Sequence, residues 1–329
     1  MKFAFIFSTA IAAPSNGIKS QALTWKRMLE NEGHEVLLIN PWQAYEWQGF
    51  QAIVFFNFSQ YMADFIRVIH KANPNIYIAP ILDPYYSKKK FSLRLRLSCK
   101  KLRLGSNFSA LYEVRNMVKA FLVRSTFEKD YIISGLGVSE SMVRLVPLSY
   151  GNEPTKISGI EKEDFCLHIS LLADTRKNVK RLVEAAIKYN FKLVLGGKLR
   201  DKSEENLLNS WIAGHSNIKY CGFLTNEEME KLYAKAKVFA LPSIFEGVGL
   251  VALEAAVRGC NIVITNQGGP KEYYNNLAIT VNPNSVDEIG KAVTTFLNGQ
   301  TFQPTLEQYL RKNYNEKKLG HLLLHELTL

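Results

Sequence analysis

The 329-residue sequence lacks any apolar run near the roughly 20 residues that a membrane-crossing helix needs, which argues against an integral membrane protein. Its four cysteines are scattered without Cys-x-x-Cys spacing, so they predict neither a disulfide framework nor a zinc site and fit a reducing cytoplasm. The histidines also show no ligand spacing, and we expect no bound metal. No low-complexity tract or internal repeat is evident. These absences leave a compact globular chain.

Strand-length apolar runs alternate with stretches of helical spacing. Residues 3–7 (FAFIF) form the first run, and after a polar loop apolar residues recur at helical spacing through Leu29. Gly33 is placed to end that helix, and residues 35–39 give the next strand, which completes a βαβ unit with parallel strands. Lys2 followed by FAFIFSTAIAA also imitates a signal peptide. A buried first strand is the preferred interpretation, because the run leads directly into a loop and helix.

The same alternation predicts an α/β protein with two doubly wound lobes. A chain of this length with 47% hydrophobic residues can bury two cores. We expect an N-terminal Rossmann-like domain over residues 1–155, a second over 156–304, and a C-terminal helix over 305–329 that packs back on the first. The cleft between the lobes is the expected ligand site. The further predicted strands are residues 52–58, 75–82, 120–123, 165–172, 192–197, 218–223, 238–243 and 261–266.

One short segment makes the protein basic. The formal net charge is +11, and residues 88–103 (KKKFSLRLRLSCKKLR) carry eight positive charges and no acidic residue. This density suits an anionic membrane surface or a phosphate-rich partner, and a solvated loop is the alternative. The leucines do not form a clean amphipathic helix, and no module that reads nucleic acid accompanies the patch, so we expect no nucleic-acid partner. The residues predicted to contact membrane or acceptor are Lys88, Lys89, Lys90, Arg94, Arg96, Lys100, Lys101 and Arg103.

Residues 240–273 (ALPSIFEGVGLVALEAAVRGCNIVITNQGGPKEY) carry most of the chemistry. A strand runs into a glycine-containing loop and then into a helix that begins near Leu250. Gly249 allows the backbone to approach a ligand closely, and the free N–H groups of the following helix favour a phosphate. Glu246 stays in the loop. Glu254 lies about one turn into the helix, where its carboxylate can accept hydrogen bonds from a ribose diol.

In these residues the sequence resembles the retaining glycosyltransferases of family 4, which have the GT-B fold, and the resemblance covers most of the chain. Glu246 and Glu254 match the family's Glu-x7-Glu element. Thr175-Arg-Lys-Asn178 resembles the basic element that holds the donor diphosphate. Further similar elements are residues 17–36, 120–147 and 221–243. Five elements in this order make the resemblance specific.

The resemblance implies that a sugar passes, with retained anomeric configuration, from a nucleotide-sugar bound by the second domain (156–304) to an acceptor bound by the first domain (1–155). Glu254 would bind the donor ribose, Glu246 the sugar hydroxyls, and Lys177 with Arg176 the diphosphate. Positive charge and helix N–H groups would stabilise the departing diphosphate, so neither a metal nor another cofactor is expected. The sequence also contains no Asp-x-Asp element, which metal-dependent sugar transferases of the other major fold generally use to hold a divalent ion. The predicted catalytic residues are Glu246, Lys177 and Asp83, and the predicted donor-binding residues are Gly17, Arg176, Lys177, Glu246, Gly249, Leu250, Val251 and Glu254.

The chain departs from the family at two positions. Ser170-Leu171 stands where members often have Gly-Arg, and Arg176 is the candidate substitute for that cation. Many members have a histidine after the fourth strand of the first lobe, where this chain has Ile81-Leu-Asp-Pro84, and Asp83 is expected to take a related place. These departures keep open a second function, that of a nucleotide-sugar-binding partner subunit without catalytic turnover.

The expected donor is a UDP-sugar, with a GDP-sugar next, and the transferred group is a hexosyl or N-acetylhexosaminyl unit. The basic segment favours a polyprenyl-diphosphate-linked or other glycan acceptor, as in bacterial surface polysaccharide synthesis. The expected location is the cytoplasm, with peripheral binding at the inner face of the cytoplasmic membrane as a further hypothesis.

Overall fold

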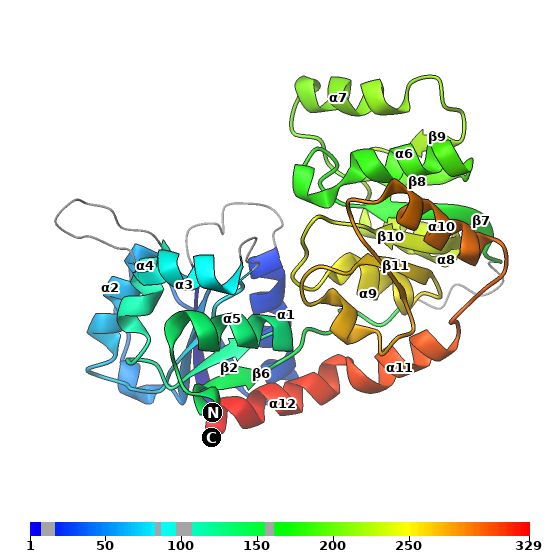
Figure 1. Cartoon of the computed structure of the whole chain (residues 1–329). Helices are drawn as coiled ribbons and strands as arrows, with labels where there is room; N and C mark the ends of the chain where they lie inside the picture. Colours follow the sequence, from blue (N-terminus) through cyan, green and yellow to red (C-terminus); the bar gives the residue numbers. More distant parts are fainter. Residues whose placement is uncertain (8–16, 83–86, 97–106, 155–160) are drawn as a thin grey trace. The chain divides into compact units, whose positions relative to one another are not determined.

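The computed structural model describes residues 1–7, 17–82, 87–96, 107–154 and 161–329. Their contacts divide the chain into two compact units (Figure 1). Unit 1 consists of Met1–Leu148 together with Glu316–Leu329, and unit 2 is Ser149–Asn315. The sequence places the domain borders at residues 155 and 304, whereas the contacts place them at 148 and 315, so that the last helix alone returns to unit 1.

Unit 1 is built on a six-stranded parallel sheet in the order β2-β1-β3-β4-β5-β6. The central strands β3 and β4 are buried throughout, as their continuous apolar sequences require when helices cover both faces. The strands are β1 (Lys2–Phe7), β2 (Glu35–Leu38), β3 (Ala52–Phe56), β4 (Ile76–Ala79), β5 (Ala120–Val123) and β6 (Val143–Leu145).

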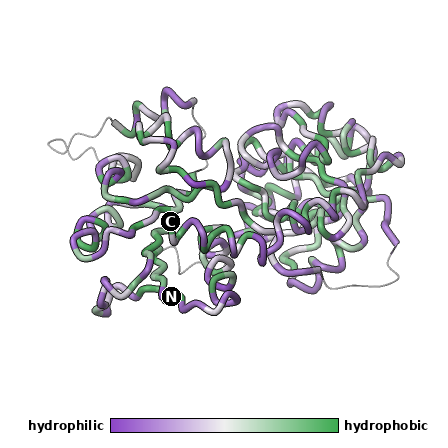
Figure 2. The backbone as a smooth tube through the Cα atoms, turned by 90° about the horizontal axis from the view of Figure 1, so that it is seen from below, coloured by the Kyte–Doolittle hydropathy of each residue, from purple (hydrophilic) through white to green (hydrophobic). Residues whose placement is uncertain are grey.

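The helices of unit 1 begin and end at recognisable capping residues. Ser59 and Ser125 cap the starts of α2 and α5 by accepting backbone N–H bonds, and Gly137 ends α5 in the left-handed conformation. Hydrophobic and hydrophilic stretches alternate along the helices, as expected when one face is buried (Figure 2). The helices are α1 (Gly17–Asn31), η2 (Trp47–Gly49), α2 (Gln60–Ile69), α3 (Lys88–Arg96), α4 (Asn107–Val114), α5 (Thr126–Leu136), η4 (Glu140–Met142) and α12 (Glu316–Thr328).

The C-terminal helix α12 packs against α1 in unit 1. Gly320 faces Met28 of α1, where an added Cβ would lie 3.3 Å from the Met28 Cβ. Tyr77 of β4 donates a hydrogen bond to the carbonyl of Leu327 (3.3 Å), and Arg27 of α1 pairs with Glu316. These contacts confirm the predicted return of the terminal helix to the first lobe.

Unit 2 has a second six-stranded parallel sheet, in the order β12-β11-β10-β7-β8-β9. Thr225 and Glu228 form a reciprocal capping box at the start of α8. The strands are β7 (Glu163–Ile169), β8 (Leu193–Gly196), β9 (Ile218–Tyr220), β10 (Ala236–Leu241), β11 (Asn261–Thr265) and β12 (Ile279–Val281). The helices are η5 (Thr175–Lys177), α6 (Val179–Tyr189), α7 (Lys202–Ile212), α8 (Asn226–Lys235), α9 (Leu250–Ala256), η6 (Pro270–Tyr273), α10 (Val286–Leu297) and α11 (Thr305–Asn313).

All ten predicted strands are present, although most are shorter than their apolar runs. The sequence did not predict β6 and β12. Each is three residues long and is an edge strand of its sheet. The basic segment opens with the helix α3, in which Phe91 and Leu95 are buried while Leu93 is exposed. The apolar residues of α3 therefore lie on two different faces of the helix, as the sequence indicated.

Candidate functional site

The two central strands of unit 2 mark the place where its chain reverses direction across the sheet. The chain moves outward from β7 through β8 to β9 and then returns to β10, on the other side of β7. Ligands of open parallel sheets bind outside the carboxyl ends of the strands at such a reversal. The loops that follow β7 and β10 contain or lead into the donor-binding residues predicted for this half of the chain.

Hydrogen bonds to the backbone join these two loops. Asn178, at the start of α6, adopts the left-handed conformation with φ of 61°. Its side-chain amide donates to the carbonyl of Pro242 (2.9 Å) and to that of Pro283 (2.7 Å). The N–H of Ile244 donates to the carbonyl of Arg176 (2.8 Å). These bonds fix the two loops relative to each other, and with them the side chains that the loops carry.

Lys177 and Glu246 meet across the two loops. The Lys177 Nζ lies 2.6 Å from the Glu246 Oε2, and 15% and 10% of their side chains are exposed. The buried hydroxyl of Ser243 donates to the same carboxylate oxygen at 3.2 Å. The structure thus brings together the two residues predicted to hold the donor diphosphate and sugar, with a small part of each side chain exposed.

Two glycines give the Glu246 loop its shape. Gly249 precedes α9 with φ of 75°, and a Cβ there would lie 3.0 Å from Leu241 and 3.4 Å from the Glu246 Cγ. Gly268 follows β11 with φ of 88° and lies alongside Glu246, so close that a Cβ would be 2.1 Å from the Glu246 carbonyl oxygen. A side chain at either position would displace the loop.

Glu254 lies one turn into α9, which begins at Leu250 and Val251 as the sequence predicts. Tyr233 of α8 donates its hydroxyl to the Glu254 Oε2 at 3.3 Å. Burial raises the pKa of Glu254 to about 7, while the charge of Arg258 and the Tyr233 hydrogen bond oppose the rise. Arg258 itself is paired with Glu230, so Glu254 has no cation of its own among the residues that the structure describes.

Arg176 precedes Lys177 but is oriented by a different carboxylate. Its guanidinium lies 3.4 Å from Asp174, and 41% of the side chain is exposed. The other oxygen of Asp174 accepts the N–H of Arg176 at 2.9 Å and caps η5. Arg176 therefore stands beside the Lys177–Glu246 pair without entering it, and its proposed contact with the diphosphate stays a prediction.

A buried histidine lies beneath the loop that follows β7. The His168 Nδ1 is 2.7 Å from the carbonyl of Ala240, which can only accept, so Nδ1 carries the proton. The Nε2 then accepts from the Ser170 hydroxyl at 2.7 Å. Burial lowers the pKa of His168 to about 4, against the Ala240 hydrogen bond and with the help of the Lys177 charge. His168 is consequently a neutral structural residue that orients Ser170, the residue found where the family often has glycine.

The predicted residues of unit 1 are described only in part. Gly17 begins α1 and is exposed, and nothing lies within 4 Å of the position that a Cβ would take there. In α3, Lys88 pairs with Asp130 of α5 at 2.6 Å, and Lys89, Lys90 and Arg94 are exposed. Arg96 ends the helix. Asp83, Lys100, Lys101 and Arg103 lie outside the described residues.

Sequence reasoning missed the residues that hold the site together. Ser243, Asn178 and Gly268 contact Glu246 or the loops, yet each looks like an ordinary loop residue. The left-handed Asn178 had a usable signal, since asparagine before a helical pattern favours a cap or a positive φ.

Two negative findings bear on the predicted partners. In the described ranges, no three His, Cys, Asp or Glu side chains are grouped in a way that could hold a metal ion. None of the described helices is both long and apolar enough to cross a membrane.

Comparison with protein families gives a match over half of the chain. Residues 153–317 match the family described as glycosyl transferases group 1. This range contains Lys177, Glu246 and Glu254, the three residues that the geometry places at the carboxyl edge of unit 2.

Similar proteins extend the match to named relatives. An uncharacterized glycosyltransferase of Methanocaldococcus jannaschii is 30% identical over 150 residues, which are 43% of this chain and 38% of that protein. The O-antigen chain mannosyltransferase B of Escherichia coli is 27% identical over 154 residues, 43% of this chain and 39% of the relative. The chain therefore aligns with about two fifths of the length of these curated relatives.

A solved structure supports the fold over the full length. Anabaena HepE, in a complex with UDP and glucose, superposes with a TM-score of 0.72 at 14% identity and covers 100% of this chain and 99% of its own. The fold class predicted from the sequence, with two doubly wound parallel sheets, is confirmed.

Proposed function

The chain belongs to the group 1 glycosyl transferases, and from this premise we propose that it transfers a sugar from a nucleotide-sugar to a glycan or lipid-linked acceptor with retained anomeric configuration. The Lys177–Glu246 pair carries the proposal. A cation and a carboxylate share the carboxyl edge of unit 2 at the strand reversal, and both are partly open. One suits a diphosphate and the other suits sugar hydroxyls.

The donor would lie along the loops that follow β7 and β10. Glu254 would accept hydrogen bonds from the ribose diol, and Glu246, oriented by Ser243, would accept them from the sugar. Lys177 would hold the diphosphate, assisted by Arg176 and by the loop backbone at Gly249, Leu250 and Val251. Burial of these groups strengthens each interaction by lowering the local dielectric.

The reaction needs charge stabilisation at the departing diphosphate. The bond from the anomeric carbon to the diphosphate oxygen breaks, and the new bond to the acceptor oxygen forms on the same face of the sugar. The acceptor proton passes to a diphosphate oxygen, which the ammonium of Lys177 stabilises as negative charge develops there. Lys177 thus supplies the role that a divalent cation has in other transferases, and we propose a reaction that is independent of metal.

A UDP-sugar is the favoured donor and a GDP-sugar is next. The similarity to the complex of HepE with UDP and glucose supports the first choice, and the similarity to an O-antigen mannosyltransferase supports hexosyl transfer in surface polysaccharide synthesis. The acceptor would then be a glycan, free or linked to a polyprenyl diphosphate. The basic helix α3 favours peripheral contact with anionic lipid at the inner face of the cytoplasmic membrane.

Thermal shifts with UDP-, GDP-, ADP- and dTDP-sugars test the donor site. A ligand at 100 times its Kd adds about 2.7 kcal/mol of stability, so the correct series should raise the Tm visibly. Glu254→Ala should lose the shift. Glu184→Ala, which removes an exposed carboxylate on α6 of the same unit, should keep it. A shift that survives in Glu254→Ala would contradict the assigned ribose contact.

Turnover separates the proposal from its alternative. Release of free nucleotide from the stabilising donor with a glycan acceptor supports an enzyme. Binding of the donor without release under any acceptor would instead favour a partner subunit without catalysis.

The membrane proposal has its own test. Reversal of Lys88, Lys89 and Lys90 to glutamate should abolish binding to vesicles that contain anionic lipid, while neutral vesicles should bind neither form. Equal binding of both forms to anionic vesicles would remove the basis of the proposal.

A further inference from the structure

A strained residue follows β4 at the carboxyl edge of the sheet in unit 1. Ile81 has φ of 51°, in the left-handed region. A β-branched side chain disfavours this conformation by about 1 to 3 kcal/mol, and such residues persist only when their surroundings hold them. The neighbouring strand ends in the same way, with Asn57 at φ of 64° and its N–H donated to Ala79 (2.8 Å).

Two buried charged side chains hold the next residue from both sides. The N–H of Leu82 donates to the Glu128 Oε1 at 2.5 Å, and the Arg124 Nη2 donates to the Leu82 carbonyl at 3.0 Å. Both backbone groups of Leu82 are thereby fixed, and so is the peptide that follows Ile81. The strained conformation thus has an identifiable restraint.

Arg124 and Glu128 are also paired with each other. The Arg124 Nε lies 3.0 Å from the Glu128 Oε2, and that oxygen accepts the Arg124 N–H at 2.8 Å. Ser125 caps α5 beneath them. Only 7% and 2% of the two side chains are exposed. This set, which we call the Leu82 clamp, consists of Arg124, Glu128 and the backbone of Leu82.

Stability alone is a weak reason for this arrangement. Burying an ion pair costs about as much desolvation energy as the pair returns, and apolar replacements are often neutral or stabilising. The Leu82 clamp also maintains the strain at Ile81. What the pair supplies is a defined backbone position at the carboxyl end of a central strand, the edge at which parallel α/β sheets bind their ligands.

We propose that Arg124 and Glu128 are positioning residues for the acceptor, because they fix the backbone of Ile81 and Leu82 at the acceptor-binding edge of unit 1. The inference rests on the proposed transfer function. The Leu82 clamp itself contacts no substrate. It acts through the segment that leaves β4.

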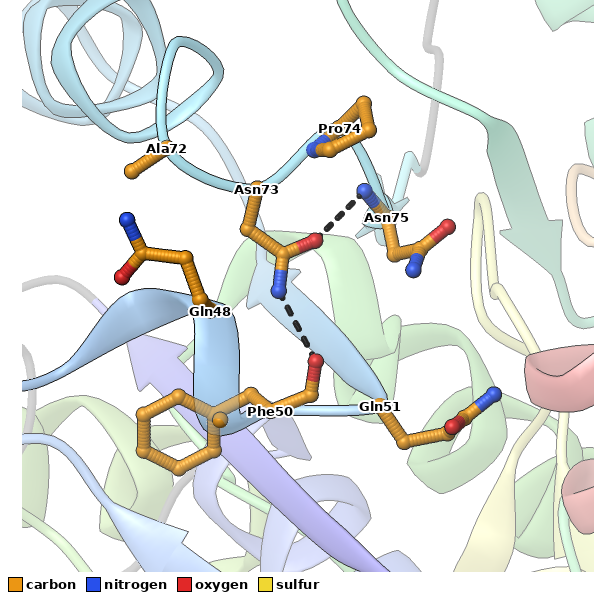
Figure 3. A pocket seen from close by; sticks show the side chains of 8 residues that line it. Gln48, Phe50, Gln51, Ala72, Asn73, Pro74 and Asn75 are labelled. Atoms are coloured by element: carbon orange, nitrogen blue, oxygen red, sulfur yellow. Dashed lines mark hydrogen bonds between the residues drawn. The ribbon is translucent and has the colours of Figure 1, made fainter.

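The opposite edge of the same sheet offers a matched control. Asn73 is buried, and its side-chain amide donates to the carbonyls of Trp47 and Phe50 at 2.8 Å each, while its oxygen accepts the Asn75 N–H at 2.9 Å. Figure 3 shows the bonds of Asn73 with Phe50 and Asn75. These groups border a hollow of about 340 Å³ beside the amino ends of β3 and β4. Asn73 thus performs a similar backbone-holding task away from the carboxyl edge.

The experiment compares Arg124→Met/Glu128→Leu with Asn73→Ala. The double variant removes both charges together, so no buried charge is left unpaired. The backbone groups of Leu82 then lack partners and can reach water only if the segment moves. We expect the acceptor KM to rise at least tenfold, with the Kd of the nucleotide-sugar within twofold of wild type. Octyl glucoside, galactoside, mannoside and N-acetylglucosaminide serve as acceptor probes, and the best for wild type is used throughout.

Two further readouts separate positioning from general loss of structure. Hydrogen exchange of the peptide that contains Leu82 should accelerate at least tenfold in the double variant while that of β1 and β3 does not. Adding Ile81→Asn, a residue that tolerates the left-handed region, should recover the acceptor KM to within threefold of wild type. Asn73→Ala should lower the unfolding midpoint and leave the acceptor KM unchanged.

Each outcome decides one point. Unchanged exchange at Leu82 would overturn the Leu82 clamp, and faster exchange with an unchanged acceptor KM would overturn its positioning role. An equal rise in KM for Asn73→Ala would show a structural effect alone. A wild-type chain that turns over no nucleotide-sugar with any probe would overturn the proposed function instead, and the inference with it.

Discussion

Among the described residues, an ion pair between two loops or elements lies at the carboxyl edge of the sheet in each unit, Arg124–Glu128 in unit 1 and Lys177–Glu246 in unit 2, and the two pairs differ in burial and in their hydrogen-bond partners. Arg124 and Glu128 in unit 1 are almost fully buried and direct their hydrogen bonds to backbone groups. Lys177 and Glu246 in unit 2 are more exposed, and among the described residues the ammonium of Lys177 has Glu246 as its one recorded partner. We propose that the more buried pair fixes backbone geometry and that the less buried pair has donors and acceptors available for a ligand.

The largest expected difference between the pairs is in stability. Glu128→Ala leaves Arg124 buried without its partner, which typically costs about 3 to 5 kcal/mol. Glu246→Ala also removes a mostly buried pair, but 15% of the Lys177 side chain is exposed and its ammonium can turn to water, so the free energy of unfolding should fall by less, about 1 to 3 kcal/mol. Urea unfolding of both variants, without ligand, measures the difference. Equal losses would mean that the less buried pair is as structural as the more buried one.

The pair in unit 2 should matter more for activity than for stability. Lys177→Met removes the cation assigned to the departing diphosphate, and loss of one such group typically lowers kcat by about 100- to 1000-fold. Arg176→Met is the matched control, because this neighbour is oriented by Asp174, and its effect should stay below about tenfold. Steady-state kinetics with a saturating acceptor gives both values. A larger loss for Arg176→Met would exchange their roles.

The regions that could be predicted from sequence are those in which local pattern decides the structure. Apolar runs flanked by glycine and polar residues gave the long strands, because burial on both faces of a parallel sheet demands continuous apolar sequence. The short edge strands β6 and β12 escaped prediction, since three residues carry too little pattern. Their pairing depends on a neighbouring strand.

The candidate site also has residues that the sequence could propose and residues that it could not. Lys177, Glu246 and Glu254 belong to motifs with fixed spacing, so the sequence could propose them, and their roles stay predictions. Asn178 contacts Pro242 across 64 residues, a contact that only the folded sheet creates, whereas Ser243 contacts Glu246 only three residues away through a loop conformation that the local sequence does not indicate. The Leu82 clamp joins residues 42 and 46 positions apart, and nothing near Leu82 in the sequence indicates it.

The affinity of unit 2 for the nucleotide-sugar should also depend on pH, through the ionisation of Glu254. Its pKa of about 7 means that the carboxylate is only partly ionised near neutrality, and in the proposed contact the ionised form accepts the hydrogen bonds of the ribose diol. Affinity for the nucleotide-sugar should rise about tenfold from pH 6 to pH 8 and level off above the pKa. Glu254→Gln should bind weakly with no such rise. Isothermal titration with the intact nucleotide-sugar avoids the terminal phosphate ionisation of a free nucleotide, and a rise retained in Glu254→Gln would place the titration elsewhere.

The smallest expected effect is the pH dependence of the stability of the wild-type chain, because two titrations in unit 2 oppose each other. Folding lowers the pKa of His168 from 6.5 to about 4, so between these values the unfolded chain binds more protons and stability rises with pH. Folding raises the pKa of Glu254 from 4.5 to about 7, so over that range the native chain binds more protons and stability falls as pH rises. The two slopes should nearly cancel between pH 4.5 and 6.5. Glu254→Gln removes the falling term, and its free energy of unfolding should then climb with pH by up to about 1.4 kcal/mol per unit, measured by urea unfolding at half-unit steps. A variant whose slope matches wild type would show that folding does not raise the pKa of Glu254.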